Sequence, residues 1–203
     1  MAAHAWFDPA HFFESLNMTS LVDSLLFGAL DLPNRILMAP MTRARGTREH
    51  VPTEMMVEYY RQRASAGLII SEAIGISQQG LGWPYATGFW SAEQVAGWRK
   101  VTDAVHAAGG RIIAQLWHMG RVVHPSFLGG SQPVSASVTT APGQAHTYAG
   151  KQPYTPARAL PLEAKDGKGI WITRQWATFE RAIAMSRLPA AECSVGRCFT
   201  GFS

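Results

Sequence analysis

The chain has 203 residues, of which 47% are apolar, 10% aromatic and 16% charged, so it has the material for a substantial core and too little charge for a disordered segment. Its 18 basic and 14 acidic side chains leave a net charge of +4, and they are scattered, which argues against a nucleic-acid partner. No apolar run of roughly 18 residues occurs, and residues 1–17 lack the basic start of a signal peptide; we therefore expect no membrane span and a cytoplasmic location.

Two cysteines, Cys193 and Cys198, lie close together near the end of the sequence. A disulfide scaffold needs more cysteines, and a zinc site needs further ligands nearby. We therefore expect two free thiols and no metal site.

The first predicted strand is the apolar run 35–39, which is followed by Pro40 and is typical of a strand buried on both faces. Thr53 is predicted to cap a helix that ends at Gly67. Four side chains of this helix stand at core-facing spacing: Met55, Met56, Tyr59 and Tyr60. Residues 67–71 are the next predicted strand.

The same unit then repeats. Ser91 and Gln94 match a capping box, and the helix that they begin is predicted to end at Gly109. Residues 111–117 are the third predicted strand. Strands and helices that alternate in this way predict βαβ units on a parallel sheet, an α/β fold whose functional residues lie at the carboxyl ends of the strands.

Residues 118–162 form a long connection that is rich in Gly, Pro, Ser and Thr. A connection of this length inside a compact domain is usually functional, so we expect a lid or a substrate wall. Beyond it, residues 172–183 predict an amphipathic helix with four apolar side chains on one face: Ile172, Trp176, Phe179 and Ile183.

The predicted strand ends carry three side chains that suit a flat heterocycle. Thr42 offers a hydroxyl and Gln115 a carboxamide, which together can match a pattern of donors and acceptors without adding charge. Trp117 offers a flat apolar wall. Each residue alone is as well explained by a place in the protein interior, and it is their joint placement that favours a binding site.

Three segments of the sequence resemble the Old Yellow Enzyme family of NADH:flavin oxidoreductases: residues 32–43, 59–73 and 115–121. The resemblance extends over residues 18–162. It implies a (β/α)8 TIM barrel that holds FMN at the carboxyl ends of its strands. NAD(P)H would reduce the flavin, and the flavin would pass hydride to a small-molecule activated alkene, such as an enone or a nitro compound.

The resemblance also implies a set of flavin-binding residues: Ala39, Pro40, Met41, Thr42, Ala73 and Gln115. The first three would pack along the isoalloxazine ring. Thr42 would hydrogen-bond flavin O4 and tune the redox potential, Ala73 would give a backbone contact, and Gln115 would bind the pyrimidine edge.

On the substrate side, the resemblance implies that Trp117 lines the pocket. Trp83 stands where the family commonly has a substrate-side tyrosine, and Thr87 stands where it commonly has proline. Tyr85 is a candidate for supplying the displaced hydroxyl.

The family's fourth strand carries a pair of histidines, or a histidine and an asparagine, that hold the substrate oxygen, and a proton-donating tyrosine follows. Here no histidine follows His146 and no tyrosine follows Tyr154. We therefore assign no catalytic acid or base.

These departures lead us to expect an incomplete barrel of about three βα units. The expected divisions are an extension over 1–17, the N-terminal part of an FMN-binding barrel over 18–162, and a divergent tail over 163–203. The hypothesis is an ene-reductase that is truncated or frameshifted in the tail and inactive alone. The alternative is a non-catalytic half-barrel that binds flavin or a protein partner. The oligomeric state stays open.

Overall fold

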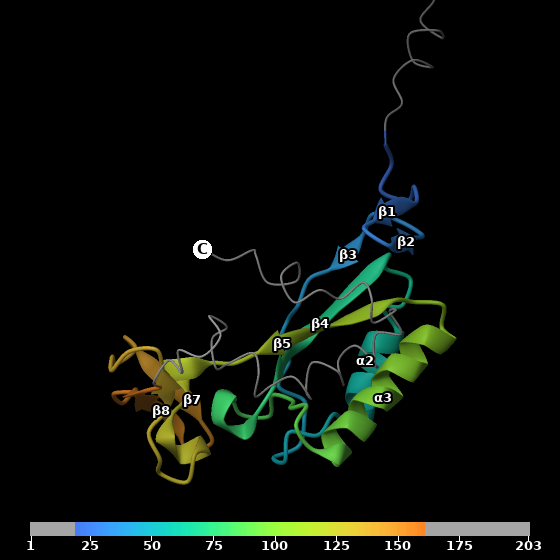
Figure 1. The fold of residues 1–203 in the computed structure, drawn as a ribbon. Helices are drawn as coiled ribbons and strands as arrows, with labels where there is room; N and C mark the ends of the chain where they lie inside the picture. The colour runs from blue at the N-terminus through green and yellow to red at the C-terminus, as the bar shows by residue number, and fades with distance from the viewer. Residues whose placement is uncertain (1–18, 161–203) are drawn as a thin grey trace, which may run out of the picture.

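The computed structural model describes residues 19–160 (Figure 1). At its centre is a parallel sheet of three strands in the order β3-β4-β5. The strands are β3 (Leu37–Met38), β4 (Leu68–Gly75) and β5 (Ile112–Trp117). Helix α2 (Glu54–Arg61) connects β3 to β4, and helix α3 (Ala92–Ala107) connects β4 to β5. The predicted alternation of parallel strands and helices is confirmed.

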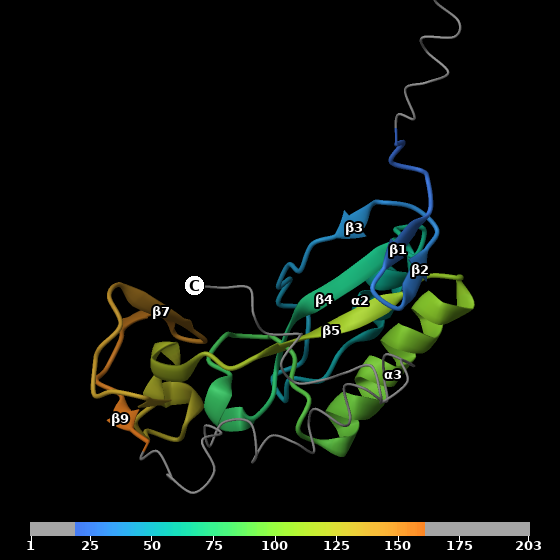
Figure 2. The same ribbon diagram turned by 45° about the horizontal axis from the view of Figure 1, so that its top comes forward.

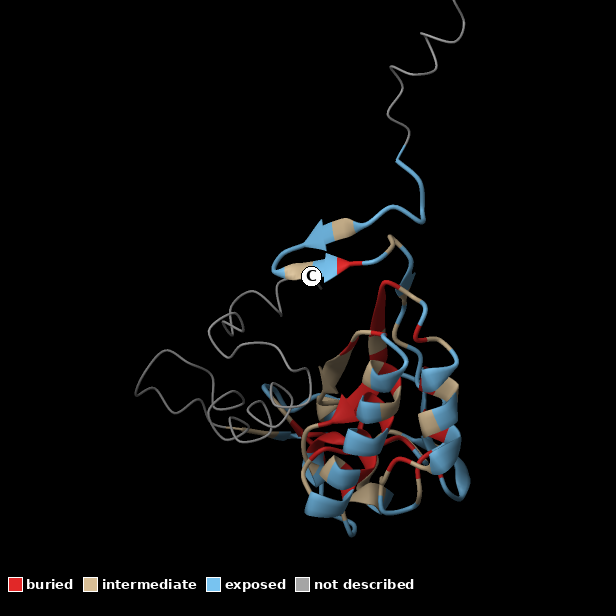
Figure 3. Ribbon diagram, turned by 90° about the vertical axis from the view of Figure 1, so that its right-hand side faces the viewer, coloured by how far each residue is buried: buried red, intermediate tan, exposed pale blue. Residues whose placement is uncertain are grey.

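The core lies between the sheet and the two helices, which cover the same face of it (Figure 1). Its buried side chains come from both helices, from β4 and β5, and from two of the connecting segments: Met56, Tyr60, Ala64, Ile69, Ile74, Phe89, Trp98, Val101, Val105 and Ile112. Figure 3 shows the buried residues gathered in the sheet and on the inward sides of the helices, with exposed residues on the outward sides. This burial is what holds helices and sheet together.

The prediction for the core-facing side of α2 is correct at two positions and wrong at one. Met56 and Tyr60 are buried, whereas Met55 is 64% exposed. Successive helix residues are turned by about 100°, so the side of α2 that buries Met56 and Tyr60 turns Met55 to solvent. Tyr59 is half-buried, with the Arg63 guanidinium 3.9 Å from its ring centroid.

Several element boundaries differ from the predicted ones. Thr53 occupies the N-cap position of α2, but its hydroxyl donates to the carbonyl of Arg45 at 2.8 Å instead of capping the helix. The helix ends at Arg61 and turns follow it. β4 continues four residues beyond the predicted end at Ser71, to Gly75, because β5 pairs with Ala73, Ile74 and Gly75.

The predicted capping box at the start of α3 is confirmed. The Ser91 hydroxyl accepts the N–H of Gln94 at 3.2 Å, and Oε1 of Gln94 accepts the N–H of Ser91 at 3.1 Å. Nε2 of Gln94 also donates to the carbonyl of Glu49 at 3.0 Å. The cap therefore fixes both the helix and the loop that follows β3.

Removing this cap gives a first testable effect. We expect Ser91→Ala to lower the free energy of unfolding by about 1 kcal/mol, because one N–H of the first turn loses its acceptor. Urea unfolding of both proteins measures the difference. Ser137→Ala removes an exposed hydroxyl from a bend and serves as the control; an equal loss in both variants would contradict the role of the cap.

The predicted long connection is an ordered lobe beyond the carboxyl end of β5 (Figures 1 and 2). It contains a hairpin of β7 (Gln144–Thr147) and β8 (Gly150–Pro153), and β6 (Val134–Ser135) paired with β9 (Arg158–Ala159). Two short 3₁₀ helices precede the strands: η2 (Gly120–Val122) and η3 (Pro125–Phe127). A third, η1 (Gln78–Gly80), follows β4.

A hairpin that the sequence did not predict lies at the other end of the sheet. It joins β1 (Leu25–Phe27) to β2 (Leu30–Leu32) in antiparallel register. Within residues 19–160, no helix is long and apolar enough to cross a membrane. The predicted helix 172–183, the cysteines, the extension 1–17 and the tail 163–203 lie outside the described residues.

Candidate functional site

A β-bulge in β4 arranges the centre of the site. Ile70 pairs with Ile113, but the next paired residue, Ala73, lies opposite Gln115, so β4 has one extra residue at this point. The Ser71 hydroxyl fills the break, because it accepts the N–H of Gln115 at 3.1 Å and donates to the carbonyl of Glu72 at 2.7 Å. The bulge places Ala73 and Gln115 side by side.

The bulge also decides which face these residues occupy. Ile74 belongs to the core on the helix side, and Leu116 packs against that core. Side chains alternate between the two faces of a strand, so Ala73 and Gln115 lie on the face away from the helices. Trp117, opposite Gly75, lies on the same face.

The segment that follows β3 meets β4 at this point. The N–H of Arg43 donates to Oε2 of Glu72 at 3.1 Å. This contact brings Thr42, the preceding residue, to the edge of the sheet where Ala73 and Gln115 lie. Thr42 follows the end of β3 by four residues, and Ala73 and Gln115 lie in the carboxyl-terminal halves of β4 and β5.

The loops after β3 and β4 are joined by main-chain hydrogen bonds. The N–H of Gly46 donates to the carbonyl of Tyr85, and the N–H of Gly88 donates to the carbonyl of His50, both at 2.9 Å. Nδ1 of His50 lies 2.7 Å from the carbonyl oxygen of Ala86. The carboxyl edge of the sheet is therefore framed by two loops that support each other.

The chemistry of the gathered residues suits FMN. Thr42 and Met41 are exposed, and Gln115 is half-buried. Within residues 19–160, the side chains of Thr42 and Gln115 make no hydrogen bond, so the hydroxyl and the carboxamide are available to a ligand. Neutral polar groups beside apolar side chains fit a flat ring system with polar edges.

Two titratable groups near these residues, the buried Glu72 and the half-buried His118, were not predicted from the sequence as site residues. Burial raises the pKa of the Glu72 carboxyl to about 7, although the N–H and the charge of Arg43 oppose the rise. Burial lowers the pKa of His118 to about 4. Nδ1 of His118 accepts the N–H of Gly120 at 3.0 Å, so its proton sits on Nε2. Glu72 could have been found from the sequence, because it is a single charged residue within a run of residues typical of a buried strand.

The lowered pKa of His118 gives a pH dependence of stability. In the unfolded chain the pKa is near 6.5, and in the folded chain it is about 4, so acid favours the unfolded state between these values. We expect the unfolding free energy of the wild type to fall, relative to His118→Asn, as the pH falls from 6.5 to 4. Thermal or urea unfolding across this range measures it, and parallel curves would contradict it.

The predicted substrate-side residues lie in two places. Trp83 packs on His146 of β7, with the ring centroids 4.8 Å apart. Trp117 lies in the sheet, and its carbonyl accepts the N–H of Ile76 at 3.1 Å. Trp83 thus links the loop after β4 to the lobe. Trp117 instead lies on the face of the sheet that points away from the helices.

Tyr85 takes part in an aromatic cluster that joins the same loop to the lobe. Its ring stands edge-on to Tyr148 at 5.1 Å, and Phe127 lies 5.6 Å from Tyr148. The Arg48 guanidinium lies 4.7 Å from the Tyr148 ring centroid. These contacts hold the lobe against the loops that follow β3 and β4.

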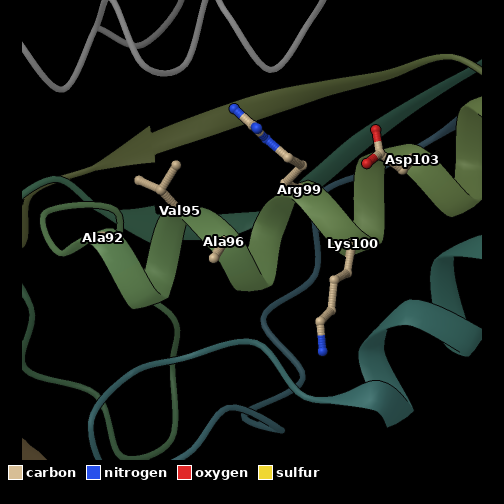
Figure 4. A pocket seen from close by; sticks show the side chains of 6 residues that line it. All are labelled: Ala92, Val95, Ala96, Arg99, Lys100 and Asp103. Carbon is tan, nitrogen blue, oxygen red and sulfur yellow. The ribbon is translucent and has the colours of Figure 1, made fainter.

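An open groove of about 490 Å³ lies elsewhere, along the outer side of α3 (Figure 4). It is lined by one stretch of that helix: Ala92, Val95, Ala96, Arg99, Lys100 and Asp103. None of these residues is a predicted site residue. The strand ends therefore remain the candidate site.

The model of the family described as NADH:flavin oxidoreductase / NADH oxidase matches residues 20–160 of the chain. The chain belongs to this family. The predicted resemblance to the Old Yellow Enzyme family is thereby confirmed, and the family is one of flavin-dependent oxidoreductases.

Curated relatives in this flavin oxidoreductase family share nearly half of the aligned residues. The flavin oxidoreductase hxnT of Emericella nidulans is 47% identical over 130 residues, which are 62% of this chain and 34% of the relative. A probable flavin mononucleotide-dependent alkene reductase of Leishmania infantum is 40% identical over 157 residues, 73% of this chain and 42% of the relative. The chain spans well under half the length of both relatives.

Solved structures of the family are similar to this chain in both sequence and fold. The Old Yellow Enzyme homologue from Zymomonas mobilis is 57% identical, with a TM-score of 0.74 over 83% of this chain and 45% of that chain. Morphinone reductase, solved in complex with tetrahydroNAD, is 40% identical, with a TM-score of 0.72 over 83% of this chain and 46% of that chain. These neighbours are (β/α)8 barrels, which confirms the predicted fold family.

Proposed function

We propose that the chain is part of an FMN-dependent NAD(P)H oxidoreductase that reduces activated C=C bonds. The observation that carries the proposal is the register of β4 and β5, which sets Ala73 beside Gln115 next to the segment that ends in Thr42. We also propose that residues 18–162 are the barrel portion of the chain and that they form about three βα units of an incomplete barrel.

In this proposal each flavin-binding residue has one task. When bound, FMN supplies the hydride chemistry. Pro40 and Met41, with Ala39, offer apolar surface to the ring system. Thr42 donates its hydroxyl proton to a flavin oxygen, and Gln115 matches the donors and acceptors of the pyrimidine edge.

We propose that the substrate pocket is formed by the face of the sheet away from the helices and by the loops at the strand ends. Trp117 walls the pocket beside Gln115, and Trp83 closes it from the loop that contacts the lobe. Apolar aromatic walls exclude water from the reacting carbons and suit small enones and nitroalkenes. We assign no catalytic acid or base, because the histidine pair and the tyrosine that the resemblance leads us to expect have no counterpart after His146 and Tyr154.

The test is a titration of the chain with FMN, followed by flavin fluorescence, while circular dichroism shows that the protein is folded. We expect saturable quenching; NAD(P)H oxidation that depends on an added enone would show that the chain is active as well. Binding without turnover would favour the alternative, a half-barrel that holds flavin without catalysis. No binding by a folded chain would overturn the proposal.

Thr42→Ala tests the role of the hydroxyl. A hydrogen bond to flavin O4 favours the reduced, more electron-rich ring, so we expect its loss to lower the midpoint potential while FMN binding changes less than about threefold. Spectroelectrochemistry measures the potential. Thr47→Ala, in the following loop, is the control, and an unchanged potential in Thr42→Ala would remove Thr42 from the flavin site.

A further inference from the structure

Glu72 is a carboxylate in an unusual place, because it lies within a central strand of the sheet and is 1% exposed. It is one of the two residues that form the bulge of β4, directly before Ala73. A buried carboxylate costs free energy unless hydrogen bonds compensate for the lost water. The partners of Glu72 therefore indicate what the residue does.

Those partners come from the loop that follows β3. Oε2 of Glu72 accepts the N–H of Arg43 at 3.1 Å, and the N–H of Ala44 favours the charged carboxylate in the same way. Ala44 has a φ of +52°, a conformation that residues other than glycine adopt at a cost. The carboxylate thus holds a strained turn in place.

The strand itself holds Glu72 from the other side. Its N–H donates to the Tyr60 hydroxyl at 2.8 Å, and its carbonyl accepts the Ser71 hydroxyl at 2.7 Å. Tyr60 is buried in the core on α2. Glu72 is therefore fixed to the rigid part of the fold, and the turn is fixed to Glu72.

The turn matters because of the residue before it. The N–H of Arg43 and the carbonyl of Thr42 belong to one planar peptide unit, so an acceptor that fixes that N–H also fixes the backbone of Thr42. We propose that Glu72 is a positioning residue, which orients the Thr42 hydroxyl toward the flavin through the backbone of the turn. The inference rests on the proposed function, since it takes FMN as the ligand of Thr42.

The charge of Glu72 bears on this role. Burial raises the pKa of Glu72 to about 7, against the opposing effects of the Arg43 charge, the N–H groups of Arg43 and Ala44, and the Tyr60 hydroxyl. The carboxylate is a stronger acceptor than the protonated acid. The hold on Thr42 is therefore firmer above neutral pH than below it.

The experiment uses the whole 203-residue chain and two readouts at about pH 8.5. FMN titration is expected to show affinity weaker by roughly tenfold in Glu72→Ala, and by about threefold in Glu72→Gln, whose amide oxygen still accepts an N–H. Hydrogen exchange of the Arg43 amide, measured without flavin, is expected to quicken in Glu72→Ala. Glu58→Ala, which removes an exposed carboxylate from α2, is expected to change neither readout.

The outcomes separate the two ideas. If the folded wild type does not bind FMN, the proposed function fails and this inference fails with it. If the wild type binds FMN and Glu72→Ala matches it in affinity and in Arg43 exchange, the inference alone is overturned. If Glu72→Ala does not fold, Glu72→Gln decides: its affinity should approach that of the wild type at about pH 5.5, where both side chains are neutral, and a constant ratio overturns the inference.

Discussion

Gln115→Leu is expected to weaken FMN binding by about tenfold to a hundredfold, because the side chain would make two or more hydrogen bonds with the flavin and each contributes about 0.5–1.5 kcal/mol. The fold should be unaffected, because Gln115 is bonded to β4 through its backbone N–H, which donates to the Ser71 hydroxyl. Leucine has a side chain of similar size and no polar atoms. Fluorescence titration with FMN measures the effect.

Gln79→Leu provides the matched control. Gln79 lies exposed in η1, so the same change of side chain there should leave FMN affinity unchanged. Equal affinities for the wild type and Gln115→Leu, with circular dichroism unchanged, would place the pyrimidine edge of the flavin elsewhere. Equal losses in both variants would point to a nonspecific effect of the leucine.

Much of the fold could be predicted from the sequence, because its signals are local. The apolar runs at β4 and β5 and the cap at Ser91 depend on neighbours within a few residues. The hairpin of β1 and β2 has short strands with exposed leucine and phenylalanine side chains. It therefore lacks the alternation that marks a half-buried strand.

The sequence indicated candidate residues for the site, but it could not indicate their geometry. Thr42, Ala73 and Gln115 lie at strand ends that the pattern of βα units already places at one edge. Their register depends on the bulge at Ser71 and Glu72, where one extra residue reverses the faces of the strand. A bulge produces no periodic pattern of apolar residues in the sequence. The single charged residue, Glu72, among apolar strand residues was the one local sign of it.

The contacts of the lobe could not be predicted from the sequence either. Composition predicted a functional connection after β5, and the aromatic residues within it gave no sign of their partners. Tyr148 meets Tyr85 and Arg48 across 63 and 100 positions of the chain respectively. Such pairings depend on how the loops at the strand ends are folded, which a single sequence does not encode in any local pattern.

Gly67→Ala is expected to have the largest effect on stability. A Cβ atom at Gly67 would overlap the carbonyl oxygen of Asn34, and it would lie 3.0 Å from the carbonyl carbon of the same residue. These are backbone atoms, and they are held in place because Oδ1 of Asn34 accepts the N–H groups of Gly67 and Ile36. The overlap therefore cannot be relieved by turning a side chain.

The cost should be about 3 kcal/mol, the upper end of what overpacking usually causes, and a large share of the stability of an ordinary domain. Urea unfolding measures it. Ser65→Ala, two positions earlier and exposed, is the control and should unfold like the wild type. An unchanged midpoint in Gly67→Ala would mean that the turn from α2 into β4 can open away from Asn34. In that case the start of β4 would be set by its pairing with β3 and β5 and not by the contact with Asn34.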